Sequence, residues 1–270
     1  MLDRIVSNAP AYLLIAVRCF AVVMTLPFFS IKIVPRIAKV ALAGYIAYIL
    51  FPHVDFSMYS SFYGEDGAFS LQYIALLLGE GLIGIITGFS VSIIFAAFST
   101  AGQFFAFQMG FSASEVYDSL SQVENPLMGQ FFNLIAMLIF LQNKWALLLF
   151  SRGLVASFDS LNVFGLIASR DVMLNFLLKG LTGLFANAFI IALPIMGTLL
   201  LISVSMGILS KAAPQMNLMS EGFPIMILTT FFVITVIMPQ LFDYFSSAFY
   251  SSFSKIQEVF ATISKNGGAI

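Results

Sequence analysis

The sequence predicts an all-α membrane-type protein, polytopic, with kinked or broken helix hairpins. Three observations lead to this fold class. The 270 residues are 60% hydrophobic and 9% charged, against about 25% charge in a soluble domain. Apolar runs that approach or exceed the ~20 residues needed to cross a bilayer recur along the chain. Prolines and short polar stretches interrupt these runs, which favours helices that bend or break.

The first two expected elements are apolar runs over residues 11–30 and 40–51. Three basic residues lie between them, at Lys32, Arg36 and Lys39. Basic residues in short loops favour the cytoplasmic side of a membrane. We therefore expect this loop to face the cytoplasm.

The third expected element is longer than a membrane is thick. No charge occurs from residue 81 to 114, and the apolar character begins at residue 71 with Glu80 as its interruption. As a helix, the uncharged part alone would extend about 50 Å, so the run must bend, break or leave the hydrocarbon. Within it, Gly81, Gly84 and Gly88 recur at helical spacing in "GEGLIGIITGF". This spacing leaves one helix face bare, so we favour close helix packing for it over a role with substrate.

Three further apolar runs follow. Residues 127–150 are split at "QNKW", which predicts a turn between two shorter helices. Residues 180–210 contain Pro194 and Gly197 as expected kinks, and residues 223–242 contain Pro239. We treat residues 1–245 as one domain and residues 246–270 as a polar C-terminal tail.

The last two runs are separated by the polar sequence "KAAPQMNLMSEGFP". Pro214, Gln215 and Asn217 are expected to shape this helix break. Irregular backbone is tolerated at membrane depth only where protein or water covers it. The break therefore lies at a membrane face or lines a cavity, and the sequence slightly favours the face.

Isolated charges mark positions that need a partner or a wet cavity. Arg18, Glu80 and Lys179 lie in apolar segments, where a charge is costly. A proton relay is one interpretation, and a structural ion pair, within the chain or to another subunit, is the other. We favour ion pairing for Arg18 and Glu80, because acids and bases are few and scattered.

Composition argues against several function classes. The 12 basic and 13 acidic residues nearly cancel, so no bulk field recruits nucleic acid. One His and one Cys exclude a disulfide within the chain and argue against a metal site. His53 lies in a loop, and no Ser/His/Asp arrangement can be built from the spacing. We expect no catalytic residue, no metal and no cofactor.

Four motifs in series resemble the FliR family of flagellar type III export proteins and its injectisome relatives. They are "VPRIAKVALAGYIAYILFP" at 34–52, "GEGLIGIITGF" at 79–89, "AGQFFAFQMGFS" at 101–112 and "APQMNLMSEGFP" at 213–224. The resemblance implies a flagellar basal-body protein of the bacterial inner membrane that forms a helical export gate with FliP and FliQ. It further implies that FlhB wraps the gate, that FlhA lies beneath it, that unfolded flagellar proteins pass through its channel, and that the function is non-enzymatic.

The resemblance also implies a role for the polar segment that follows the third apolar run. In the family this segment plugs the channel at rest, together with a methionine ring from FliP. Here it maps to residues 108–125, which become small and acidic after Gly110. The plug residues are then Gln108, Met109, Gly110, Phe111, Val116 and Tyr117. A solvated connection between two helices is the alternative.

Three other functions stay open on the sequence, and the third of them is an intramembrane enzyme, which a paired set of acids or a Ser/His pair facing one cavity would support. The virulence-associated injectisome homologue belongs to the same class and would export effectors instead of flagellar subunits. A secondary transporter of small solutes also uses broken helices near prolines, with an internal repeat and a polar site at the membrane midplane. Neither feature is clear in this sequence.

Overall fold

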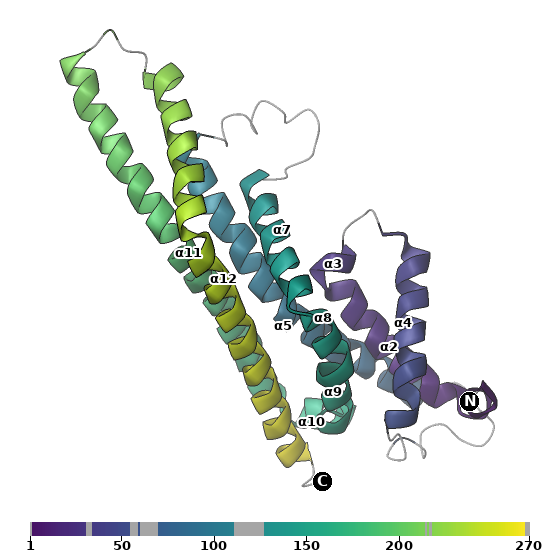
Figure 1. The fold of residues 1–270 in the computed structure, drawn as a ribbon. Coiled ribbons are helices and arrows are strands. Elements are labelled where there is room, and N and C mark those ends of the chain that lie inside the picture. The colour runs from purple at the N-terminus through teal and green to yellow at the C-terminus, as the bar shows by residue number, and fades with distance from the viewer. Residues whose placement is uncertain are drawn as a thin grey trace. The chain divides into compact units, whose positions relative to one another are not determined.

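The computed structural model describes residues 2–30, 34–54, 59, 70–110, 127–213, 215 and 218–267, and every regular element within them is helical (Figure 1). The expected all-α fold class is therefore confirmed. The chain divides into two compact units. Unit 1 comprises Met1–Ser92, Phe140–Gly180 and Tyr250–Ile270, and unit 2 comprises Ile93–Ile139 and Leu181–Phe249.

Unit 1 begins with a helical hairpin. It is built from α1 (Leu2–Ser7), α2 (Ala9–Thr25), α3 (Pro27–Ser30), α4 (Arg36–Leu50) and the short 3-10 helix η1 (Phe51–His53). Pro10 lies in the first turn of α2, where a missing N–H costs nothing. Leu26 is extended and ends α2 directly before Pro27. The Tyr12 hydroxyl donates to the Gly44 carbonyl at 2.9 Å and ties α2 to α4.

The turn predicted at "QNKW" is confirmed. Helix α7 (Leu127–Gln142) ends there, and Lys144 adopts a left-handed conformation with φ 56° directly before α8 (Trp145–Leu148). A π-helical turn, η4 (Leu149–Gly153), leads into α9 (Leu154–Ser160), and α10 (Val163–Ala168) follows. The indole N–H of Trp145 donates to the Tyr250 hydroxyl at 3.3 Å and anchors α8 within unit 1.

Among the described residues, three helices are long and apolar enough to cross a membrane: α5 (Leu71–Gln108), α11 (Arg170–Ala212) and α12 (Leu218–Gly267), of which Ser220–Ile263 qualify. The bent pair formed by α7 and the α8–α9 stretch adds a fourth if it counts as one span. At 1.5 Å per residue, the 43 residues of α11 give about 65 Å of helix, twice the ~30 Å of a hydrocarbon core. The long runs therefore extend beyond the hydrocarbon.

Helix α12 (Leu218–Gly267) continues through the region expected as a polar tail. Pro224 and Pro239 lie inside it without ending it. In its last part Ile256, Phe260 and Ile263 are buried at steps of four and three residues. This amphipathic spacing explains why no continuous apolar run marks the end of the helix.

The core of unit 2 is aromatic. Phe245 of α12 meets Phe95 and Phe98 of α5 edge to face, with ring centroids 5.5 and 4.9 Å apart. Such pairs stabilise a core beyond the area that they bury. The Tyr244 hydroxyl donates to the side-chain oxygen of Asn187 at 3.0 Å and joins α12 to α11. These contacts fix the pairing of three long helices within unit 2.

Candidate functional site

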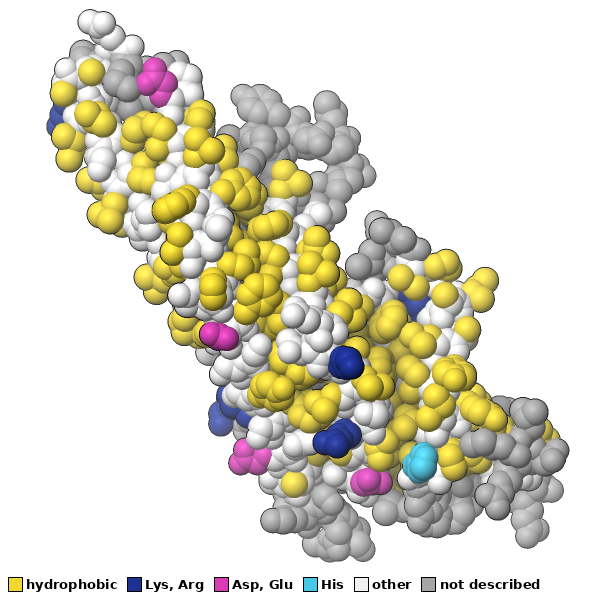
Figure 2. Space-filling view, in the orientation of Figure 1, with side chains coloured by type: hydrophobic (Ala, Val, Ile, Leu, Met, Phe, Trp, Pro, Cys, Tyr) yellow, Lys and Arg dark blue, Asp and Glu magenta, His cyan; other side chains and the backbone are white. Residues whose placement is uncertain are grey.

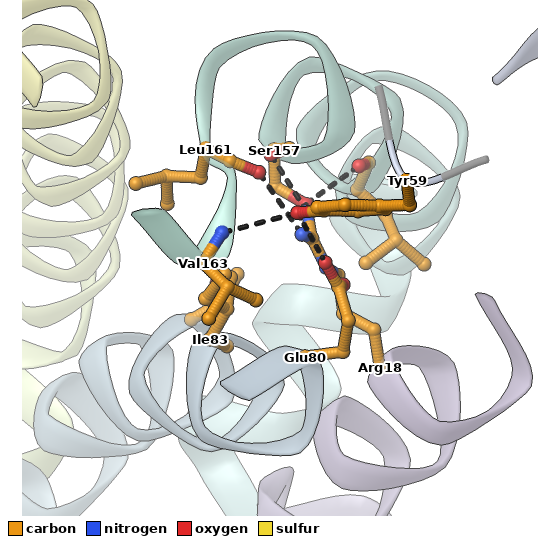
Figure 3. A network of polar contacts seen from close by, with 9 residues as sticks. Arg18, Tyr59, Glu80, Ile83, Ser157, Leu161 and Val163 are labelled. Carbon is orange, nitrogen blue, oxygen red and sulfur yellow. Dashed lines mark hydrogen bonds and ion pairs between the residues drawn. The ribbon is translucent and has the colours of Figure 1, made fainter. Parts of the chain in front are cut away.

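Unit 1 holds a cluster of polar side chains in an otherwise apolar interior (Figure 3). Arg18 comes from α2, Glu80 from α5 and Ser157 from α9, and their exposed fractions are 1%, 0% and 0%. Tyr59, which precedes α5 in the chain, is 4% exposed and completes the cluster. Helices α2, α5 and α9 and the residue Tyr59 therefore meet through polar groups that are buried from water.

Arg18 uses its guanidinium on three partners. Its Nε donates to Oε2 of Glu80 at 2.5 Å, a buried ion pair. One terminal nitrogen donates to the carbonyl and hydroxyl oxygens of Ser157 at 2.7 and 3.3 Å, and the other donates to the Leu161 carbonyl at 3.0 Å. The Phe158 ring lies 4.1 Å from the guanidinium carbon, in cation–π geometry. These contacts compensate much of the desolvation of the Arg18 charge.

Tyr59 bridges Glu80 to the backbone of α10. Its hydroxyl donates to Oε1 of Glu80 at 3.1 Å and accepts from the Val163 N–H at 3.1 Å. Burial, followed by the negative charge of Glu80, raises the pKa of the Tyr59 phenol above the ordinary value of 10.0. The hydroxyl therefore keeps its proton at neutral pH and can donate.

The chemistry of this cluster is that of a satisfied ion pair. Both carboxylate oxygens of Glu80 accept a hydrogen bond, one from Arg18 and one from Tyr59. A proton relay needs a chain of acids and bases, whereas this cluster contains a single carboxylate. Among the described residues, no group of three or more His, Cys, Asp or Glu side chains could hold a metal ion. The geometry favours a structural role.

The predicted packing glycines face α2. A Cβ on Gly84 would lie 2.5 Å from the Arg18 carbonyl oxygen, and a Cβ on Gly88 would overlap the Thr25 side chain. A Cβ on Gly81 would make an ordinary contact with Val17 at 3.4 Å. The structure thus brings α5 and α2 close together at two of the three positions.

The predicted plug residues are described only in part. Gln108 is the last residue of α5, Met109 is 0% exposed, and Gly110 has φ +82°. A Cβ on Gly110 would collide with the Phe223 ring. Both the positive φ and the lack of space beside this ring therefore favour glycine at this position. The other three, Phe111, Val116 and Tyr117, lie outside the described residues.

The structure describes only some of the remaining predicted residues. α11 ends at Ala212 and α12 begins at Leu218, so the helix is interrupted between them. Gln215 is exposed there, while Pro214 and Asn217 lie outside the described residues. Lys179, which the sequence predicts to need a partner or a wet cavity, is exposed on the surface of the single chain.

Sequence reasoning missed the partners of the ion pair and a second glycine contact. Tyr59 and Ser157 are common residue types and belong to no recognisable motif. Leu161 takes part through its backbone carbonyl, which the residue type does not reveal. In unit 2 a Cβ on Gly102 of α5 would lie 2.5 Å from the Met128 carbonyl oxygen of α7. Glycine spacing gives no signal for that contact, because Gly102 lies 14 residues after Gly88 and Gly129 has no other glycine in its run.

Apolar side chains cover much of the face seen in Figure 2, where charged residues are sparse. On α12 Leu228, Phe232 and Val236 are 71%, 69% and 56% exposed. The charged residues that the structure describes in unit 2 are Lys211, Glu221 and Asp243. A surface of this kind is covered by lipid or by another protein.

The chain resembles proteins of known role along most of its length. Residues 9–252 match the family described as Bacterial export proteins, family 1. The flagellar biosynthetic protein FliR of Bacillus subtilis (strain 168) is 28% identical over 271 residues, covering 97% of this chain and 99% of that protein.

Two further relatives cover large parts of the chain. The FliR protein of Escherichia coli (strain K12) is 28% identical over 246 residues, 91% of each chain. The surface presentation of antigens protein SpaR of Shigella flexneri is 31% identical over 186 residues, 67% of this chain and 66% of that protein. With its long apolar helices and its family match over residues 9–252, the chain is a membrane-type helical protein that belongs to the bacterial export proteins, family 1.

Proposed function

We propose that this chain is a component of the flagellar type III protein export gate and forms, with FliP and FliQ, the channel for unfolded flagellar subunits. The family match over residues 9–252 carries the proposal, because it spans all the long helices up to the last part of α12. The proposed location is the bacterial inner membrane, within the flagellar basal body. FlhB and FlhA are the further proposed partners, and the role is non-enzymatic.

The exposed apolar surface supports an assembly with other subunits. Helices α11 and α12 carry many exposed large hydrophobic side chains along lengths that exceed a bilayer. Lipid tails can cover only about 30 Å of such a surface. The rest needs protein, and subunits with similar apolar helices would supply it.

Co-purification tests this assembly. An affinity-tagged chain, produced with FliP and FliQ from the same bacterium, should elute with both in one complex after detergent extraction. A tagged, unrelated polytopic protein of that membrane serves as the control. Isolation of the chain without either partner, under conditions in which FliP and FliQ are present and folded, would contradict the proposal.

We further propose that residues 108–125 help to seal the closed channel. Apolar side chains in a narrow pore exclude water and so block ions. The close fit of Gly110 beside Phe223 supports a defined starting point for the segment. Membranes that carry the complete complex should leak a small dye when residues 110–123 are deleted. An assembled deletion complex that stays tight would make the segment a connector.

The injectisome export apparatus is the second candidate. The 31% identity to SpaR favours it as a relative of the same class. Neighbouring genes separate the two: flagellar genes support the flagellar gate, and effector genes support the injectisome.

A further inference from the structure

The buried cluster in unit 1 lies at a turn between two short helices. Helix α9 ends at Ser160 and α10 begins at Val163, and Leu161 and Asn162 between them are extended. Short helices leave unpaired N–H and C=O groups at their ends, which other groups must satisfy when they are buried. The polar contacts of the cluster supply such partners from distant parts of the chain.

Arg18 caps the C-terminal end of α9. The Ser157 carbonyl already accepts the last helical hydrogen bond, from the Leu161 N–H at 3.0 Å, and Arg18 donates a second one. The Leu161 carbonyl lies past that last bond and accepts from Arg18 at 3.0 Å. Basic side chains stabilise helix C-termini in this way, because they pair the last carbonyls and match the helix dipole.

Tyr59 caps the N-terminal end of α10. Its hydroxyl accepts from the N–H of Val163, the first residue of that helix. Asn162 adds a local cap, since its side-chain oxygen accepts from the Gly165 N–H at 2.5 Å. The start of α10 therefore depends on one group from its own turn and on one from Tyr59, which is 104 residues away in sequence.

Glu80 connects the two external caps. One of its carboxylate oxygens accepts from Arg18 and the other accepts from Tyr59. Gly79 beside it makes the arrangement possible, because a Cβ there would lie 2.5 Å from a Val163 methyl group. On the other side, Gly81 faces Val17 of α2. Gly79 thus lets α10 approach the single carboxylate that holds both capping groups.

We propose that Arg18, Glu80 and Tyr59 form one conformational device, in which Glu80 couples the cap on α9 to the cap on α10. Displacement of Tyr59 releases the start of α10, and loss of the Glu80 carboxylate releases both sides of the turn. The three residues are positioning residues for the α9–α10 turn. This inference is independent of the function proposed above, since it concerns contacts within one chain.

Hydrogen–deuterium exchange of the purified full-length chain, resolved to single amides, tests the device. In Tyr59→Phe the Val163 N–H loses its acceptor, and its exchange should become roughly three- to tenfold faster. In Glu80→Leu, which removes both carboxylate oxygens at similar volume, the amides of Leu161 and Val163 should both exchange faster. Unchanged exchange at Val163 in Tyr59→Phe, or a change at one amide alone in Glu80→Leu, would overturn the coupling.

Two further variants keep the test decisive. Tyr73→Phe removes another buried phenol of unit 1, which donates to the Pro10 carbonyl at 2.8 Å, and should leave the Val163 amide unchanged. If Tyr73→Phe accelerated exchange of the Val163 amide as much as Tyr59→Phe does, the cause would be a general destabilisation of unit 1. That result would refute the proposed coupling. If Glu80→Leu does not fold, Glu80→Gln replaces it. Because glutamine offers one acceptor oxygen, at least one of the two amides must exchange faster, and two unchanged amides would refute the coupling.

Discussion

Arg18 and Glu80 carry opposite charges in an interior that excludes water, so each stabilises the fold only while the other is present. Transfer of a charged side chain from water into the protein interior costs several kcal/mol. A close partner of opposite charge, together with further hydrogen bonds, offsets this cost. Here the pair is 2.5 Å apart, and each member has additional partners in the same cluster. Loss of one member leaves the other charge buried without its partner, which destabilises the fold.

A pair of substitutions tests this balance. Arg18→Met leaves the Glu80 carboxylate buried without its counter-ion and should lower the free energy of unfolding by about 3–5 kcal/mol. The double variant Arg18→Met/Glu80→Leu should recover part of the loss, because no charge remains buried. Denaturant unfolding of the purified chain in detergent measures both. A single variant as stable as the parent chain would contradict a buried, paired charge.

Tyr59 gives the cluster a dependence on alkaline pH. Its pKa is raised in the fold, so above the ordinary tyrosine pKa of 10.0 the unfolded chain releases a proton that the folded chain retains. The contribution of Tyr59 to stability is therefore fully present below pH 10.0 and declines as pH rises above it. Tyr59→Phe should show a smaller alkaline loss of stability than the parent chain. Equal losses would indicate an unperturbed phenol.

Sequence reasoning reaches the charged half of this cluster and stops there. Arg18 and Glu80 stand out because a charge in an apolar run is costly and needs an explanation. Tyr59, Ser157 and the Leu161 carbonyl carry no such signal, since a tyrosine, a serine and a peptide bond are ordinary at any position. Their roles follow from three-dimensional proximity across more than 100 residues.

At the scale of elements, the contact between α2 and α5 depends on missing side chains. Gly84 lies one turn after Glu80 and opposes the Arg18 backbone, so the same close approach that packs the helices also places the ion pair. The glycine spacing was visible in the sequence. The sequence did not indicate which of these glycines lies closest to α2, because that depends on the rotation of α2 about its axis.

Alanine substitutions separate tight glycines from free ones. Gly84→Ala should destabilise the chain by about 1–3 kcal/mol through overpacking, less the helix propensity that alanine adds. Gly183→Ala is the matched control, because nothing lies within 4 Å of its Cβ position, and it should raise stability by up to about 1 kcal/mol. Thermal unfolding in detergent compares them. If Gly183→Ala destabilised the chain and Gly84→Ala did not, the result would contradict the packing described for these helices.

Helix boundaries were predictable where apolar runs end abruptly and not where helices become amphipathic. The turn at "QNKW" and the interruption between α11 and α12 coincide with polar residues or proline. In contrast, α11 begins at Arg170 and α12 continues to Gly267, beyond the apolar runs. In those extensions one helix face is polar, so total hydropathy falls while the helical period persists.

On the scale of the whole molecule, the question is what covers the exposed apolar helices. Phe232 of α12 is 69% exposed, whereas Phe245 of the same helix is 0% exposed. Phe245→Ala should cost about 3–5 kcal/mol in the isolated chain. Phe232→Ala should change its stability by less than about 0.5 kcal/mol and yet weaken co-purification of FliP and FliQ. Unimpaired co-purification would assign this position to lipid.

Export of flagellar proteins by the living cell tests whether the chain belongs to the export gate. The gene is deleted in the source bacterium, and the hook and filament proteins that reach the culture medium are measured with and without the restored chain. If the chain is part of the export gate, deletion abolishes their export and the restored chain recovers it, while their intracellular synthesis continues. Undiminished export of hook and filament proteins from the deletion strain would exclude a necessary role of the chain in the gate.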